Sequence, residues 1–148
     1  MKWVTRRRIQ VNRAATAWLI RRFIDPEAMF LFVDPAEVAA VQEREGATGF
    51  DAPGATYPHK DAQGHCSFEA LVEERCAGDT ALGRLARIVH DADFPQEAPK
   101  TAEAVGLRAI SRGFPLAFKD DAETVERAGH LYDALYAALQ AEEEGGSK

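Results

Sequence analysis

The sequence lacks several features that would place it in well-known classes of protein. It holds only two cysteines, Cys66 and Cys76, which are too few and too oddly placed for the disulfide framework of a small secreted domain. No apolar run approaches the roughly 20 residues that a membrane-spanning helix needs. No apolar signal core follows the basic residues near the start. We therefore expect a cytoplasmic protein with no membrane partner.

Standard catalytic signatures are missing as well. The chain has no Gly-x-Ser-x-Gly, no glycine-rich loop of the kind that cradles phosphates and no His-Glu-x-x-His. These motifs mark acyl transfer, nucleotide binding and zinc proteolysis, because each sets specific groups at a fixed geometry. The sequence pattern therefore assigns no catalytic residue, and whether the protein is an enzyme stays open.

Net positive charge is the third absence. The 148 residues carry 18 Lys and Arg against 24 Asp and Glu, a net charge of -6, and this argues against a general nucleic-acid binder. The charge is uneven: residues 1–25 carry +6 and the remainder -12. Such a basic segment suits a local anion site, whereas the alternative is a set of solvated arginines that pair with acidic helices. Arg13 is the arginine that we most expect to be buried, beside a carboxylate or an anion.

The remaining pattern predicts an α+β, helix-rich single domain over residues 1–148. A chain of this length buries enough surface to fold without a metal or a disulfide. Strand-like runs at residues 2–5, 29–33 and 47–50 alternate with helical segments at 14–24 and 35–45, which gives a β-α-β-α-β start. About four helices follow, capped by Ser67 and Asp79 or spanning residues 100–110 and 121–141. Residues 142–148 are expected to form a flexible acidic tail.

Candidate metal ligands gather after an unusually long loop at residues 51–64. The stretch HKDAQGHCSFE brings His59, Cys66 and Glu69 within eleven residues, and His90 and Asp93 lie three apart at a helix end. Imidazole and carboxylate ligands suit zinc, iron or manganese, and Cys66 as a further ligand would favour zinc. The alternatives are histidines that are solvent-exposed or hydrogen-bonded and a His90 that interacts with its helix dipole. If the two segments converge, His59, Glu69, His90 and Asp93 form a mixed coordination sphere.

Five ordered blocks give the chain a family resemblance. They are NRAATAWLIRRFIDPEAMFLFV, GATGFDAPGATYPH, CSFE, IVHDAD and DALYA, and they lie between residues 12 and 137. Together they resemble the chromate-resistance family, specifically the C-terminal domain of chromate-sensing regulators of the ChrB type. Such regulators carry a separate DNA-binding domain ahead of this region. The resemblance does not include that domain, so it implies no nucleic-acid partner for this chain alone.

The resemblance implies a role in chromate resistance or chromate sensing. We expect a domain that binds a divalent transition metal through His59, Glu69, His90 and Asp93, while Arg7 and Arg13 recruit an oxyanion such as chromate. The competing hypothesis is a metal-dependent oxidoreductase or hydrolase whose open metal site faces residues 51–65. A third is an interaction module without a ligand. The oligomeric state and the identity of the metal stay open.

Overall fold

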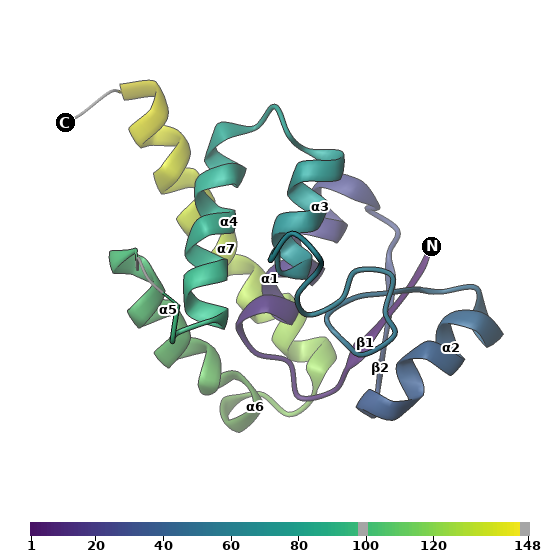
Figure 1. Ribbon diagram of the computed structural model, residues 1–148. Coiled ribbons are helices and arrows are strands. Elements are labelled where there is room, and N and C mark those ends of the chain that lie inside the picture. Colours follow the sequence, from purple (N-terminus) through teal and green to yellow (C-terminus); the bar gives the residue numbers. More distant parts are fainter. Residues whose placement is uncertain (98–100, 146–148) are drawn as a thin grey trace.

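The computed structural model describes residues 1–97 and 101–145, which form a small parallel sheet followed by packed helices (Figure 1). The elements are β1 (Lys2–Arg6), α1 (Val11–Leu19), the π-helical turn η1 (Ile20–Ile24), β2 (Met29–Val33), the 3-10 turn η2 (Pro35–Glu37), α2 (Val38–Glu45), β3 (Thr48–Gly49), α3 (Ser67–Arg75), α4 (Thr80–Asp93), α5 (Ala102–Arg112), α6 (Phe114–Ala117) and α7 (Asp121–Gly145). This order confirms the predicted α+β class. The four-residue α6 was not predicted.

The parallel direction of its strands decides which residues of the sheet lie close together. Its order is β2-β1-β3, and both pairings are parallel, with Lys2 opposite Met29 and Trp3 opposite Thr48. Parallel strands bring their carboxyl ends to the same edge of the sheet. Arg6 is the last residue of β1, and Asp51 is the second residue after β3. The two side chains therefore lie beside each other at this edge.

The central strand is buried on both faces. Side chains alternate along a strand, so Trp3 enters the main core whereas Val4 packs with Val38, Val41 and Ala52 in a smaller core beneath α2. Figure 1 shows α2 apart from the other helices, across the strands. The helix ends at Gly46, whose φ of 64° is the left-handed conformation that glycine adopts without strain. The predicted stop at Gly46 is confirmed.

The main core lies on the opposite face, around α1. Trp18 is its aromatic centre, with ring centroids of Phe23, Phe68, Tyr132 and Tyr136 between 5.6 and 6.5 Å away. These rings come from η1, α3 and α7, so one α1 side chain joins three other elements. The packing fixes α1 against the rest of the helices and holds its first turn, which includes Arg13, beside the carboxyl edge of the sheet.

Two helix starts test the predicted caps. Asp79 caps α4 as expected, since its Oδ1 accepts a hydrogen bond of 2.9 Å from the Leu82 amide. The predicted Ser67 cap is wrong, because Cys66 is the N-cap of α3. The Ser67 hydroxyl is instead turned into the core, where it lies 3.0 Å from Asn12 Nδ2 and 3.2 Å from Thr16 Oγ1.

The last helix runs to Gly145, further than the predicted end near residue 141. The tail predicted for residues 142–148 thus overlaps the final turn of α7, and residues 146–148 lie outside the described residues. Within the described ranges, no helix combines the length and apolar character required to cross a membrane.

Candidate functional site

The four predicted metal ligands lie close together but divide into two groups. His90 Nδ1 and Glu69 Oε1 share a hydrogen bond of 2.5 Å, whereas His59 Nδ1 lies 3.6 Å from Asp93 Oδ2. The ring of Phe94 packs edge-on with both histidines, at centroid distances of 5.0 Å to His59 and 4.7 Å to His90. The structure therefore brings the predicted residues together as two neighbouring groups around one phenyl ring.

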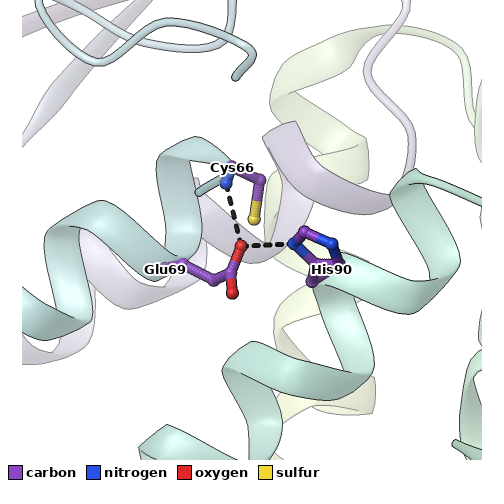
Figure 2. A group of neighbouring side chains, drawn as sticks. All are labelled: Cys66, Glu69 and His90. Atoms are coloured by element: carbon purple, nitrogen blue, oxygen red, sulfur yellow. Dashed lines mark hydrogen bonds and ion pairs between the residues drawn. The ribbon is translucent and has the colours of Figure 1, made fainter. Parts of the chain in front are cut away.

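The first group is built on the start of α3 and joins Cys66, Glu69 and His90 (Figure 2). Glu69 Oε1 accepts a hydrogen bond of 2.9 Å from the Cys66 amide, and Cys66 Sγ accepts one from the Glu69 amide, which forms a capping box. His90 reaches the same carboxylate from α4. One ligand atom from each residue lies within 4.8 Å of the other two. The start of α3 thus presents a thiol and a carboxylate to an imidazole.

The His90 ring is held at both nitrogens. Its Nε2 lies 2.9 Å from Glu97 Oε1, and Lys60 Nζ fixes the other Glu97 oxygen at 2.6 Å. Burial by itself would lower the pKa of His90, but the hydrogen bonds to Glu69 and Glu97 outweigh it and raise the pKa above its ordinary value. The imidazole is therefore orientated by carboxylates on opposite sides.

Burial controls the thiol of this group. Cys66 is fully buried, and this burial, followed by the negative charge of Glu69, raises the pKa of the thiol well above its ordinary value. A buried neutral thiol is a poor nucleophile. Without a cation beside it, Cys66 is therefore an inert side chain in the wall of the site.

The second group is centred on Asp51, which sequence analysis missed. Asp51 is 2 % exposed and has a positive φ of 51°. Its Oδ1 lies 2.7 Å from His59 Nδ1 and 3.2 Å from an Arg6 nitrogen, and its Oδ2 lies 3.4 Å from Arg13 Nη1. Arg6 Nε also donates to the Asp51 carbonyl at 2.6 Å. One buried carboxylate thus gathers three cationic or titratable side chains.

Asp93 is the second buried carboxylate of this group. Burial and the charge of Asp51 raise its pKa to about 6, against the opposing pull of His59, Arg13 and Arg6. The pKa of His59 is also raised, chiefly by its hydrogen bond to Asp51. Among the described residues, no hydrogen bond reaches Asp93 Oδ2. Asp93 therefore changes charge near pH 6, and His59 keeps its proton to a higher pH than an ordinary imidazole does.

A polar pocket of about 170 Å³ opens beside this group. Its lining consists of two arginines, two aspartates and three neighbours from the start of α1: Arg13, Arg108, Asp51, Asp93, Gln10, Val11 and Asn12. Burial lowers the pKa of Arg13, and its Nε makes no hydrogen bond with any residue that the structure describes. The pocket is thus lined by a buried guanidinium that has an unused donor.

The two predicted anion-binding arginines have different surroundings. Arg13 lines the pocket as expected, whereas Arg7 lies outside its lining and pairs with Asp34 at 3.0 Å, with both side chains more than half exposed. Arg6 and Arg108 are the additional arginines that sequence reasoning missed. The carboxyl-edge rule for parallel strands could have indicated Arg6 and Asp51, because both follow strand ends. No sequence pattern indicates Arg108, Lys60 or Glu97.

Comparison with known proteins assigns the chain to a family. A family model described as the C-terminal domain of ChrB matches residues 3–139. The chain belongs to the ChrB C-terminal domain family. Protein ChrB of Cupriavidus metallidurans is 36% identical over 136 residues, which cover 91% of this chain and 40% of that protein. No solved structure matched the chain.

The matched range of this ChrB-family domain includes both groups and the pocket. Residues 3–139 contain every side chain described above, from Arg6 to Arg108. The chain spans 40% of the length of the relative from Cupriavidus metallidurans, so the likeness concerns one domain of that protein.

Proposed function

We propose that this ChrB-family domain acts in chromate resistance or chromate sensing, binds an oxyanion such as chromate beside Arg13, and holds a divalent transition metal nearby. The family membership supports the role, and the blocks that resemble chromate-resistance proteins include the residues of both groups. We also propose a cytoplasmic location, since Cys66 and Cys76 are both free thiols.

The single observation that carries the oxyanion proposal is the buried Arg13 with its unused Nε donor. The largely buried guanidinium donates from Nη2 to the Arg8 carbonyl at 3.0 Å and from Nη1 to Asp51 at 3.4 Å, which leaves Nε without an acceptor among the described residues. A tetrahedral oxyanion offers several acceptor oxygens to one arginine fork. The pocket volume of about 170 Å³ compares with about 30 Å³ for a water molecule in the liquid, so a four-oxygen anion fits.

The charge balance around the pocket also favours an anion. Arg6, Arg13 and Arg108 lie at or beside it, and the raised pKa values of His59 and Asp93 make the group more positive near neutral pH. Asp51 is neutralised by its ion pairs with Arg6 and Arg13. Three arginines face two carboxylates, so the surroundings of the pocket are net positive even with Asp93 ionised, and protonation of Asp93 adds one more positive charge that favours an anion.

Isothermal titration of the purified domain with chromate, and separately with sulfate, tests this proposal. We expect one oxyanion per chain and at least a ten-fold loss of affinity in Arg13→Gln, with a similar loss in Arg108→Gln. Arg7→Gln is the matched control, because Arg7 is exposed and pairs with Asp34 outside the pocket. Equal affinity in all four proteins would overturn the proposal. A loss in Arg7→Gln alone would move the anion site to Arg7.

The metal proposal retains the ligands predicted from sequence. His59 and Asp93 belong to the group around Asp51, and Glu69 and His90 belong to the group with Cys66. Each group offers imidazole and carboxylate donors, a set that divalent zinc, iron or manganese accepts. Metal analysis of the purified domain, compared with His59→Ala and Glu69→Ala, tests whether the protein holds stoichiometric metal.

A metal-dependent enzyme is the second candidate function, because each group supplies three donors and a tetrahedral ion would keep a fourth position for water or substrate. Repeated reduction of chromate by the metal-loaded domain with an added electron donor, lost in Glu69→Gln, would support it. Stoichiometric binding without turnover supports the sensor instead.

A further inference from the structure

Resting on the metal part of the proposed function, we infer that the ion is bound by Cys66, Glu69 and His90, that it is of the zinc class, and that the group around Asp51 is kept for the anion. Sequence analysis predicts His59, Glu69, His90 and Asp93 as the metal ligands and Cys66 only as a possible further ligand. The geometry instead points to the three donors that meet between the start of α3 and α4 (Figure 2). A thiolate, an imidazole and a carboxylate together suit zinc better than magnesium or calcium, which prefer oxygen ligands.

The three donors are close to the spacing that a tetrahedral ion requires. Bonds of about 2.0 Å to oxygen and nitrogen and 2.3 Å to sulfur put ligand atoms about 3.3–3.6 Å apart. The donor atoms of Cys66, Glu69 and His90 all lie within 4.8 Å of one another. Glu69 Oε1 and His90 Nδ1 are closer, at 2.5 Å, because they share a proton. An ion that replaces this proton separates the two atoms by about 1 Å.

The second nitrogen of His90 gives independent support. Metal-binding histidines almost always donate the other ring N–H to a carboxylate, a carbonyl or water, which fixes the tautomer and the ring direction. His90 Nε2 lies 2.9 Å from Glu97 Oε1, and Lys60 holds Glu97 from the far side. His90 Nδ1 is thereby left directed at Glu69. For His59, by contrast, the contacts to Asp51 and Asp93 both involve Nδ1, so they do not divide between the two ring nitrogens as those of His90 do.

The start of α3 prepares Cys66 to bind a cation as a thiolate. Its Sγ already accepts the Glu69 amide in the capping box, and the positive end of a nine-residue helix favours negative charge there. A bound zinc ion deprotonates a coordinating thiol outright. The burial that keeps the thiol neutral by itself is then overcome by the direct bond to the ion.

The group around Asp51 is less suitable for a cation. Its central carboxylate is paired with Arg6 and Arg13, so an ion placed there would face two guanidinium groups within about 4 Å of its ligand. Among the described residues, no arginine forms a hydrogen bond or ion pair with Cys66, Glu69 or His90. Glu69 and His90 are 20% and 18% exposed, so water can complete the coordination. The domain therefore separates a cation site from an anion pocket.

Titration of the metal-free domain with Co²⁺, a zinc surrogate whose bond to a thiolate gives a ligand-to-metal absorption band, tests the inference. We expect one Co²⁺ per chain, the thiolate band in the wild type, and displacement of Co²⁺ by Zn²⁺. Cys66→Ser should lose the band, and its hydroxyl keeps the helix cap, so the variant folds. Cys76→Ser is the matched control and should keep the band. His90→Gln should weaken Co²⁺ binding at least ten-fold, whereas His59→Gln should not.

The outcomes separate this inference from the proposed function. Stoichiometric Co²⁺ without a thiolate band, or a band that survives in Cys66→Ser, overturns the Cys66 site while metal binding itself stands. Absence of any bound Co²⁺ overturns both metal claims. Sulfate titration of the same variants isolates the anion claim, because Cys66→Ser leaves every residue of the pocket lining in place.

Discussion

Arg13 and Asp51 form an ion pair across 38 residues of sequence, with Arg13 Nη1 3.4 Å from Asp51 Oδ2 and the carboxylate 2 % exposed. The pair joins the first turn of α1 to the segment after β3. Because the same carboxylate also binds Arg6 and His59, it connects the sheet edge, the first long helix and the long loop. The pocket beside Arg13 is therefore held in shape by one buried aspartate.

Removing the charge of Asp51 should destabilise the domain. Asp51→Asn leaves Arg6 and Arg13 without their shared counter-ion, and breaking a buried pair from one side costs about 3 kcal/mol. Urea unfolding at neutral pH measures this loss. The matched control is Asp34→Asn, which breaks the exposed pair with Arg7 and should change the stability by less than about 1 kcal/mol. Equal effects of both changes would contradict the proposed role of Asp51. Added sulfate should restore part of the lost stability by supplying a counter-ion.

The raised pKa of Asp93 predicts a stability that falls as pH rises. Below about pH 3 the carboxyl is largely protonated in both states. Between that pH and about 6 the unfolded chain releases the proton that the native state keeps, so unfolding becomes easier. Asp93→Asn should therefore be more stable than the wild type at neutral pH, by about 3 kcal/mol, and nearly equal to it at about pH 3. Urea unfolding at the two pH values decides this, and a variant less stable than the wild type at neutral pH would contradict it.

Oxyanion affinity should rise as pH falls through about 6. Protonation of Asp93 and of His59 makes the surroundings of the pocket more positive. Sulfate is the suitable probe, because it stays a dianion over this range whereas chromate itself takes up a proton. Isothermal titration from about pH 5 to 8 should show at least a ten-fold change in affinity. Asp93→Asn should reduce this dependence. A pH-independent affinity in the wild type would contradict the assignment.

Local sequence signals predicted much of the fold. Asp79 caps α4 and Gly46 ends α2, because a capping carboxylate and a left-handed glycine act within a few residues of the backbone that they satisfy. The strand at Met29–Val33 was also predicted with its observed bounds. Ser67 misled the prediction, since a distant partner on α1, Asn12, draws its hydroxyl into the core.

The site itself could be predicted only in part. Cys66, Glu69 and His90 were recognisable because ligand-type side chains occur close together in sequence or at a helix end. Asp51 was not, because its role depends on Arg6 and Arg13 arriving from β1 and α1. Glu97 acts through His90 from beyond the end of α4, and its contact is set by tertiary folding rather than by spacing.

Zinc binding should release protons in a number that depends on pH. The Cys66 thiol is neutral before the ion binds, and His90, whose pKa is raised above its ordinary value, is charged at mildly acidic pH. Because the ion needs a thiolate and a neutral imidazole, about two protons leave at mildly acidic pH and fewer once His90 has lost its proton at higher pH, and the affinity for zinc falls as the pH is lowered. Titration calorimetry in buffers of different ionisation enthalpy counts these protons.

Cys66→Ser provides the matched comparison, because the serine hydroxyl has no proton that titrates in this range and the count should fall by one. Two protons leave as a divalent ion enters, so the net charge beside the pocket hardly changes at mildly acidic pH, and zinc should alter the sulfate affinity by less than about three-fold there. A proton count near zero, or one unchanged in Cys66→Ser, would show that the ion is bound by carboxylates and not by the thiol.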